Sequence, residues 1–503
     1  MSNLIKEASF ELREIILNSL GNLVRTGQLP AEPIPSFNIE IPNDKAHGDF
    51  ATNAAMVCAK TFKLPPRKIA ELICENVVLD GSFFEKTEVA GPGFINFFLG
   101  KRWFSMVVEN VLTEKENYGK VHIGENKKLM VEFVSANPTG PMHIGNARGG
   151  AIGDCLASVL SWAGYDVTRE FYVNDAGNQI EKFATSLEVR YLQLYKDGVV
   201  LPEDAYQGQD IAVHSKNFAD IYGDKYVEAS SEERRAALVE YALPLNISKL
   251  KSDLMKYRIE YDVWFLESTL HESGKVLEIV EKLKEKGLTY EKEGAVWIKS
   301  TEFGAEKDDV LVRANGIPTY FAADIAYHYN KFIDRNFDKV IDVWGADHHG
   351  HVARLKGAME ALGIESSRLD VVLMQMVRLM RDGELVKVSK RTGKSITLVD
   401  LLDEVPIDAA RFFFNLREAN SHFDFDLGLA IEQSSKNPVY YVQYAHARIC
   451  SILRNLEAEG IKMRELSLKD FDVLNAPEEI ELIRHLASLP MEIEDAAKSY
   501  DPA

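Results

Sequence analysis

The sequence Met130-Val131-Glu132-Phe133-Val134-Ser135-Ala136-Asn137-Pro138-Thr139-Gly140-Pro141-Met142-His143-Ile144-Gly145-Asn146 decides how the fold of this chain is interpreted. An apolar run is followed by a turn rich in proline and glycine and then by a helical pattern over 151–162. A strand that ends in a tight turn at a helix start directs backbone N–H groups and the positive end of the helix dipole at one point. This stretch therefore predicts a phosphate site, with His143 and Asn146 as side-chain donors.

A second cationic segment lies far downstream, at Lys387-Val388-Ser389-Lys390-Arg391-Thr392-Gly393-Lys394. Its glycine and hydroxyl residues are typical of a loop, and its cations are suited to pyrophosphate charge, with Lys390 as the main candidate. No Walker lysine motif occurs in the sequence, which argues against a P-loop NTPase. Two separate phosphate sites indicate one triphosphate ligand.

Composition and charge narrow the class of protein. The chain has 503 residues, of which 46% are hydrophobic and 27% charged, which predicts two to four soluble domains. A net charge of −19 argues against non-specific coating of nucleic acid. The four cysteines lie far apart and form no C-x-x-C pair, so neither disulfides nor a zinc knuckle is indicated. No signal segment or membrane-length apolar run is visible, and we expect a cytoplasmic protein.

Strands alternate with helices between residues 116 and 400. The candidate strands are 129–134, 166–173, 339–344 and 371–377, and a helix is expected after each of the first three. This alternation predicts an α/β fold with a Rossmann-type parallel sheet. Charged, mostly helical sequence at about 185–290 is interpreted as an inserted domain.

The flanking regions differ in character. Residues 1–115 form an N-terminal α+β module that opens with an amphipathic helix and ends in a strand at 94–99. Alternation places Phe94 and Asn96 on one face of that strand, where they could stack on and hydrogen-bond a base, although a core strand with one edge asparagine fits the sequence equally well. After residue 400, segments 401–414 and 437–456 have helical patterns, which predicts a C-terminal all-α region.

Taken together, the motifs resemble those of the arginyl-tRNA synthetase family of class I aminoacyl-tRNA synthetases. The segments that carry this resemblance are Val131 to Pro141 leading into His143-Ile144-Gly145-Asn146, then Tyr172-Val173-Asn174-Asp175-Ala176-Gly177, Gly345-Ala346-Asp347-His348-His349-Gly350, Lys387-Val388-Ser389-Lys390-Arg391 and, near the N-terminus, Gly48-Asp49-Phe50-Ala51-Thr52-Asn53. The resemblance covers essentially the whole chain. It implies ATP-dependent ligation of L-arginine to tRNA(Arg) through an arginyl-adenylate, with release of AMP and pyrophosphate.

The resemblance also assigns the regions. It implies that 1–115 contacts the tRNA elbow, that 116–400 is catalytic, that 401–436 contacts the acceptor stem and that 437–503 begins the anticodon-binding domain. That last domain is expected to be incomplete, because the chain stops at Tyr500-Asp501-Pro502-Ala503. The implied tRNA-contacting residues are Phe94, Asn96, Tyr441, Tyr444, Ala445 and Arg448. We expect a monomer that does not bind membranes.

A receptor for a guanidinium must supply carboxylate, carbonyl or hydroxyl oxygens, because the group has five donors and no acceptor. Glu132, Asn137, Tyr320 and Asp324 meet this requirement, and Tyr320 and Asp324 would share one helix face. The resemblance implies that Asp324 and Glu132 hold the guanidinium while Asn137 and Tyr320 position the substrate. The full arginine site that it implies is Glu132, Ser135, Asn137, His143, Tyr320, Asp324 and His348.

The implied reaction requires no general base, because the arginine carboxylate is already ionised when it attacks the α-phosphorus of ATP. The expected catalytic residues are His143, Asn146, Lys387 and Lys390. The expected ATP site is Pro138, Gly140, His143, Gly145, Asn146, Gly345, Asp347, His348, Lys387, Ser389 and Lys390. Mg²⁺ would arrive with ATP, and no tightly bound cofactor or protein metal site is expected. A metal held by His348, His349 and His351 is disfavoured, because no further ligand completes the set.

Two positions depart from the family pattern. Asn146 replaces the usual second histidine of the first signature, and Val388 replaces the usual methionine of the lysine loop. Asn146 keeps a donor but cannot become a cation. Two other classes remain open: another nucleotidyl transferase such as a cytidylyltransferase, and a non-catalytic tRNA-binding paralogue. Retention of His143 and Lys390 argues against the second.

Overall fold

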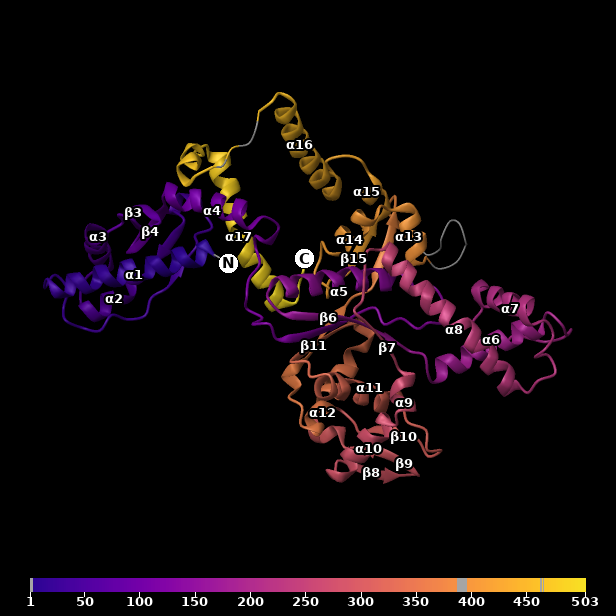
Figure 1. Cartoon of the computed structure of the whole chain (residues 1–503). Coiled ribbons are helices and arrows are strands. Elements are labelled where there is room, and N and C mark those ends of the chain that lie inside the picture. Colours follow the sequence, from indigo (N-terminus) through magenta and orange to yellow (C-terminus); the bar gives the residue numbers. More distant parts are fainter. Residues whose placement is uncertain (1–2, 387–395, 462–463, 465) are drawn as a thin grey trace. The chain divides into compact units, whose positions relative to one another are not determined.

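The computed structural model describes residues 3–386, 396–461, 464 and 466–503 (Figure 1). The chain forms two compact units. Unit 1 consists of 1–121 and 456–495, and unit 2 of 122–455 and 496–503. Among the residues placed by the structure, no helix combines the length and apolar character of a membrane span.

Unit 1 contains a four-stranded antiparallel sheet in the order β1-β2-β4-β3. Helix α1 buries Leu12, Ile16, Leu20 and Leu23, which lie three or four residues apart, in the core that the sheet and helices share. Its elements are α1 (Leu4–Arg25), β1 (Ile39–Glu40), β2 (Phe50–Thr52), α2 (Ala54–Phe62), α3 (Pro66–Asn76), β3 (Phe84–Ala90), β4 (Phe94–Leu99), α4 (Lys101–Glu114) and most of α17 (Pro477–Ser499).

Unit 2 is built on a five-stranded parallel sheet in the order β12-β11-β5-β6-β7. Its strands are β5 (Lys128–Glu132), β6 (Asp166–Val173), β7 (Val263–Leu266), β11 (Lys339–Gly345) and β12 (Leu369–Met374). Helix α5 (Ile144–Trp162) covers one face, whereas α11 (Tyr320–Tyr329) and α12 (His349–Leu362) cover the other (Figure 1). This arrangement confirms the prediction of an α/β fold with a parallel sheet.

Close packing between α5 and the sheet depends on a small residue. A Cβ added at Gly153 would lie 2.3 Å from Phe133 Cγ, so only glycine allows the helix to approach the end of β5 this closely. Because β5 is the central strand, the start of α5 is brought directly to the carboxyl edge of the sheet. In open α/β sheets, this edge is where ligands bind.

The remaining elements of unit 2 surround this sheet. Helices α6 (Asn178–Leu192), α7 (Gln209–Tyr222) and α8 (Ser231–Lys256) share an apolar core of their own, which includes Phe183, Tyr191 and Phe218. The other elements are α9 (Ser268–Glu272), α10 (Lys275–Glu285), β8 (Thr289–Lys292), β9 (Ala295–Ile298), β10 (Asp309–Val312), the π-helical turn η4 (Asn330–Asp334), β13 (Val377–Arg381), β14 (Glu384–Leu385), α13 (Leu398–Glu404), α14 (Ile407–Phe414), β15 (Phe423–Asp426), α15 (Leu427–Ile431) and α16 (Pro438–Ala458).

Several expected boundaries are corrected. The strand expected at 371–377 is two strands in different sheets, β12 and β13. The helix expected at 401–414 is α13 and α14, separated at Pro406, which forms the N-cap of α14. The stretch 185–290, interpreted as an insertion, contains β7, which pairs with β6 and belongs to the parallel sheet. A strand of four residues with no alternation of burial is hard to recognise among helices.

Candidate active site

A cavity of about 1030 Å³ opens at the carboxyl edge of the parallel sheet in unit 2. The turn after β5 lines it, as do residues of β6, β11 and α11 and the segment before α7. Most of the predicted arginine and phosphate residues meet here: Glu132, Ser135, Asn137, Gly140, His143, Asn146, Tyr320, Asp324, Gly345 and His348. The sheet topology therefore brings together residues that are up to 216 positions apart, from Glu132 to His348.

The turn after β5 has a strained backbone. Val134 and Ser135 have φ angles of 69° and 41°, in the left-handed region that a β-branched residue rarely occupies. This conformation ends the strand at Glu132, two residues before the expected boundary. It also places Ser135 Oγ 2.8 Å from Glu132 Oε1, where the hydroxyl donates to the carboxylate and accepts from the backbone N–H of Tyr172 at 3.1 Å. The strained turn thus fixes one carboxylate of the cavity.

The signature turn is held at both ends. Asn246 on α8 donates to the Pro138 carbonyl at 2.9 Å, and His214 contacts Asn246 at 2.8 Å, so the helical region after β6 supports the turn. At the start of α5, Asn146 Oδ1 accepts from the backbone N–H of His143 at 3.0 Å. The side-chain oxygen of Asn146 is therefore used as a cap, which leaves its amide N–H groups for a ligand.

The predicted lysine loop lies outside the described residues, as do Lys387, Ser389 and Lys390. The structure describes the chain again from residue 396. There, Thr397 forms an antiparallel bridge with His143, and the backbone N–H of Leu398 donates to the Met142 carbonyl at 2.9 Å. The segment that follows the predicted lysine loop is thus anchored directly on the signature turn.

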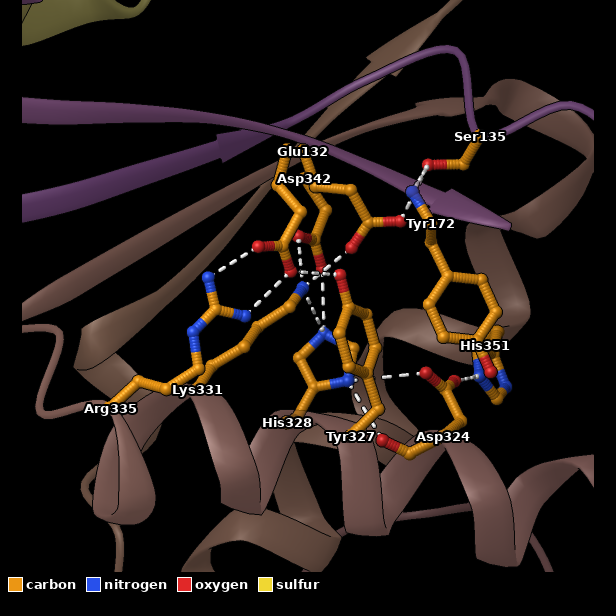
Figure 2. A network of polar contacts seen from close by, with 11 residues as sticks. Glu132, Ser135, Tyr172, Asp324, Tyr327, His328, Lys331, Arg335, Asp342 and His351 are labelled. Atoms are coloured by element: carbon orange, nitrogen blue, oxygen red, sulfur yellow. Dashed lines mark hydrogen bonds and ion pairs between the residues drawn. The ribbon is translucent and has the colours of Figure 1, made fainter. Parts of the chain in front are cut away.

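The two predicted guanidinium carboxylates line the cavity, but each already has a basic partner. Glu132 Oε2 accepts from Lys331 Nζ at 2.6 Å, and Asp324 Oδ1 lies 3.1 Å from His328 Nδ1 (Figure 2). Asp324 Oδ2 also accepts a short hydrogen bond from His351 Nε2. Burial acts to raise the pKa of Asp324, but His328 and His351 outweigh it and lower this pKa. Asp324 is therefore an anion at neutral pH.

His328 is a buried imidazolium. Its Nε2 lies 2.8 Å from Asp342 Oδ2, and its Nδ1 lies 2.9 Å from the carbonyl oxygen of Asp324. Each ring nitrogen faces an acceptor, which favours a proton on both, whereas Lys331 Nζ lies 3.3 Å from Nε2 and opposes the charge. Burial and Lys331 act to lower the pKa of His328, but Asp342 and Asp324 raise it to about 9.

His328→Gln should remove a part of the stability that depends on pH. The pKa of His328 in the folded state, about 9, is above the ordinary histidine value of 6.5. Its charge therefore stabilises the fold fully below about pH 6.5 and ceases to do so as the pH rises through about 9. We expect the Tm of the variant to lie below that of the wild type by more at about pH 6 than at about pH 10. Thermal unfolding followed by circular dichroism would measure both, and an equal difference at the two pH values would contradict the assignment of charge.

Other predicted residues occupy polar positions around the cavity. Tyr320 is half exposed, and its hydroxyl accepts from the backbone N–H of Asn178 at 2.9 Å. Asn137 Oδ1 accepts from Asn174 at 3.0 Å. Gly345 and His348 line the cavity, whereas the side chain of Asp347 between them is 82% exposed. Gly145 lies in the first turn of α5.

The residues predicted to contact tRNA lie elsewhere. In unit 1, Asn96 is buried at 5% exposure on β4, an inner strand of its sheet, and Phe94 is half-buried. The burial of Asn96 fits the alternative of a core strand, except that β4 is an inner strand and not an edge, and it leaves Asn96 little surface for a base. On α16, Tyr441, Tyr444, Ala445 and Arg448 are exposed.

Several side chains at the cavity were not predicted from the sequence. Glu267 follows β7, is 2% exposed, and has an Oε2 atom without a hydrogen-bond partner among the described residues. Glu267 is not predicted from the sequence, because the four residues of β7 have no alternating pattern that marks them as a strand. His351 and Trp344 also line the cavity, as do Gln179, Tyr206 and Asp210. Lys331, His328 and Asp342 form a buried ion-pair network next to the cavity. The one sequence feature that points to it is Asp342, a lone carboxylate in the apolar run 340–344.

Known families match the chain over most of its length. Residues 107–426 match the family described as "tRNA synthetases class I (R), catalytic domain". Residues 11–99 match "Arginyl tRNA synthetase N terminal domain", and residues 442–503 match "DALR anticodon binding domain".

Individual relatives agree with these matches. The chain is 56% identical to an arginine–tRNA ligase of Ruminiclostridium cellulolyticum, with 100% of this chain and 90% of the relative covered. It is 57% identical to the arginine–tRNA ligase of Caldanaerobacter subterraneus, with 100% and 89% covered. A putative arginyl-tRNA synthetase structure from Campylobacter jejuni is 34% identical over 80% of this chain and 86% of that chain, with a TM-score of 0.71. The Thermus thermophilus arginyl-tRNA synthetase shares the fold at 20% identity, with a TM-score of 0.69 over 98% and 88% of the two chains.

Proposed function

The chain belongs to the arginyl-tRNA synthetase family of class I, and we propose that the cavity of unit 2 is where it ligates L-arginine to tRNA(Arg). One observation carries the assignment of the site. Two carboxylates, Glu132 and Asp324, and the signature turn with His143 line one cavity of about 1030 Å³. An acidic site for a cation and an N–H-rich site for phosphate are thus adjacent.

We propose that the acidic side of the cavity binds the arginine side chain. A guanidinium donates in one plane, and carboxylates that accept from it form charge-assisted hydrogen bonds. Asp324 and Glu132 supply the acceptors, and Tyr320 and Asn137 position the rest of the amino acid. Such hydrogen bonds contribute about 1.5–3 kcal/mol each, so they discriminate strongly against apolar amino acids and make a separate editing site unnecessary.

At the other side, the arginine carboxylate attacks the α-phosphorus of ATP. The new bond joins a carboxylate oxygen to that phosphorus, and the bond to the bridging oxygen breaks as pyrophosphate leaves. His143 and the amide of Asn146 donate to phosphoryl oxygens while negative charge spreads over them. Gly345 and His348 contact the nucleotide, and Lys387 and Lys390 neutralise the leaving pyrophosphate together with Mg²⁺ that arrives with ATP.

The second step transfers the arginyl group from the adenylate to the terminal ribose of the tRNA, at the 2′-hydroxyl, and releases AMP. Exposed Tyr441, Tyr444 and Arg448 on α16 are suited to stacking on and pairing with RNA. We propose that they contact the tRNA and that 1–115 contacts its elbow. The cytoplasmic location and the monomeric state stay predictions.

An ATP–pyrophosphate exchange assay over all amino acids, with and without tRNA(Arg), tests this function. We expect exchange with arginine alone among the amino acids, and in this family it should require tRNA. Exchange driven by cysteine, glutamine or glutamate instead would overturn the arginine assignment. Absence of exchange with every amino acid would favour the non-catalytic paralogue.

A further inference from the structure

Three ionisable side chains lie directly behind the two cavity carboxylates. Lys331 and Asp342 are 0% exposed and His328 is 1% exposed. Figure 2 shows Lys331 and His328 extending from the helix toward Glu132 and Asp342 on the strands. Lys331 Nζ lies 2.6 Å from Glu132 Oε2 and 3.0 Å from Asp342 Oδ1, so one ammonium joins a cavity carboxylate to a buried one.

The cluster is built around this ammonium rather than around a metal ion. Glu132, His328 and Asp342 are close enough together to resemble a ligand set. However, Lys331 Nζ is within 3.3 Å of a polar atom of each of them and supplies the positive charge that a metal would bring. A second basic side chain, His328, joins Asp342 to Asp324 on the other side.

The acidic and basic side chains of this network are unequal in number. Glu132, Asp324 and Asp342 contribute three negative charges, and Lys331 and His328 contribute two positive charges. The neighbouring Arg335 and Glu170 form an ion pair and cancel each other. Among these five groups one negative charge is left over. Of their three carboxylates, Glu132 and Asp324 line the cavity, where Glu267 adds a further buried carboxylate.

We propose that Lys331, His328 and Asp342 are positioning residues that set the charge and orientation of Glu132 and Asp324, and thereby select a cationic amino-acid side chain. The inference rests on the proposed function, since it deepens the arginine specificity of the same cavity. Asp342 holds both basic side chains in place, one against each cavity carboxylate. A bound guanidinium completes the charge balance, whereas a neutral isostere such as citrulline leaves the carboxylates uncompensated.

The physical reason is the cost of burial. The pKa of Glu132 is raised overall, because burial outweighs the opposing effect of Lys331. The geometry favours the ionised form, since Lys331 donates to Oε2 and Ser135 donates to Oε1. Without the ammonium, Glu132 would take up a proton and become a poor acceptor for a cation. The basic groups that act on Glu132 are Lys331, His328 and Arg335, and Arg335 is paired with Glu170. The other groups are Asp342 from β11 and the hydroxyls of Tyr172, Tyr261 and Tyr327.

The test uses the charge-balanced double variant Lys331→Met/Asp342→Asn, with His328→Gln as a second variant in case the first does not fold. Arginine-dependent ATP–pyrophosphate exchange in the presence of tRNA(Arg) gives KM for arginine and for ATP at several pH values. For the double variant we expect the KM for arginine to rise and the KM for ATP to stay close to wild type. The KM for arginine should rise about tenfold for each pH unit by which the pKa of Glu132 exceeds the pH of the assay. This arginine KM should fall as the pH is raised, because Glu132 then loses its proton. In His328→Gln the arginine KM should also rise while the ATP KM stays close to wild type.

Glu188→Gln is the matched control. Glu188 is also a buried carboxylate with basic partners, Arg234 and Arg235, but it lies on α6 and does not line the cavity. We expect this variant to lower Tm and to leave the arginine KM close to wild type. An unchanged arginine KM in the folded test variants, a parallel rise in the KM for arginine and ATP, or an equal effect of Glu188→Gln would overturn the inference.

Failure of both test variants to fold would also overturn it, because the network would then serve the fold alone. If the wild type shows no arginine-dependent exchange, the proposed function fails rather than this inference.

Discussion

Asp324→Asn should lower kcat/KM for arginine by about 10²- to 10⁴-fold, since two charge-assisted hydrogen bonds of about 1.5–3 kcal/mol each would be lost. The side chain lines the cavity and is anionic because His328 and His351 lower its pKa. Asparagine keeps the shape and can still accept from His328, so the fold should persist. In the exchange assay with tRNA(Arg), the loss should appear in the kcat/KM for arginine, whereas the KM for ATP should stay close to wild type.

Asp424→Asn is a suitable control for this variant. Asp424 lies on β15 and forms an exposed ion pair with Arg378, away from the cavity. Exposed ion pairs contribute little, so arginine kinetics should be unaffected. Near-normal arginine kinetics in Asp324→Asn itself would mean that the guanidinium binds elsewhere.

His143→Ala should reduce kcat for adenylate formation by about 10²- to 10³-fold, which is the usual effect of removing one preorganised donor to a developing negative charge. The imidazole is exposed in the cavity at the N-terminus of α5, where the helix dipole also favours phosphate. Its backbone N–H donates to Asn146 Oδ1, a contact that the variant keeps. Single-turnover adenylate formation would measure the effect on chemistry apart from product release.

His422→Ala, which removes an exposed histidine outside the cavity, should leave this rate unchanged. If His143→Ala raised the KM for ATP but left kcat intact, the imidazole would serve binding rather than the transition state.

Much of the fold could be predicted because local patterns determine it. The apolar run and glycine-rich turn at 130–146 indicate a strand, a turn and a helix, and the structure has β5 and α5 there. Strand β6 agrees with its expected range of 166–173. By contrast, β7 was missed because four residues of uniform burial carry no periodic signal, and its place in the sheet comes from pairing with β6.

In the site, the chemistry of the residues identified the two cavity carboxylates, Glu132 and Asp324, but not whether they are ionised or paired. A sequence lists Lys331, His328 and Asp342 without showing that they meet behind Glu132 and Asp324. Whether a carboxylate is ionised, paired or free depends on burial and on neighbours within a few ångströms, which are tertiary properties.

The sequence by itself determined the class of fold, the signature turn and the family, because these depend on residue types at fixed short spacings. Only the tertiary structure decided that two buried basic residues, Lys331 and His328, stand behind Glu132 and Asp324, because the crossover connections of a parallel sheet bring distant parts of the chain to one edge.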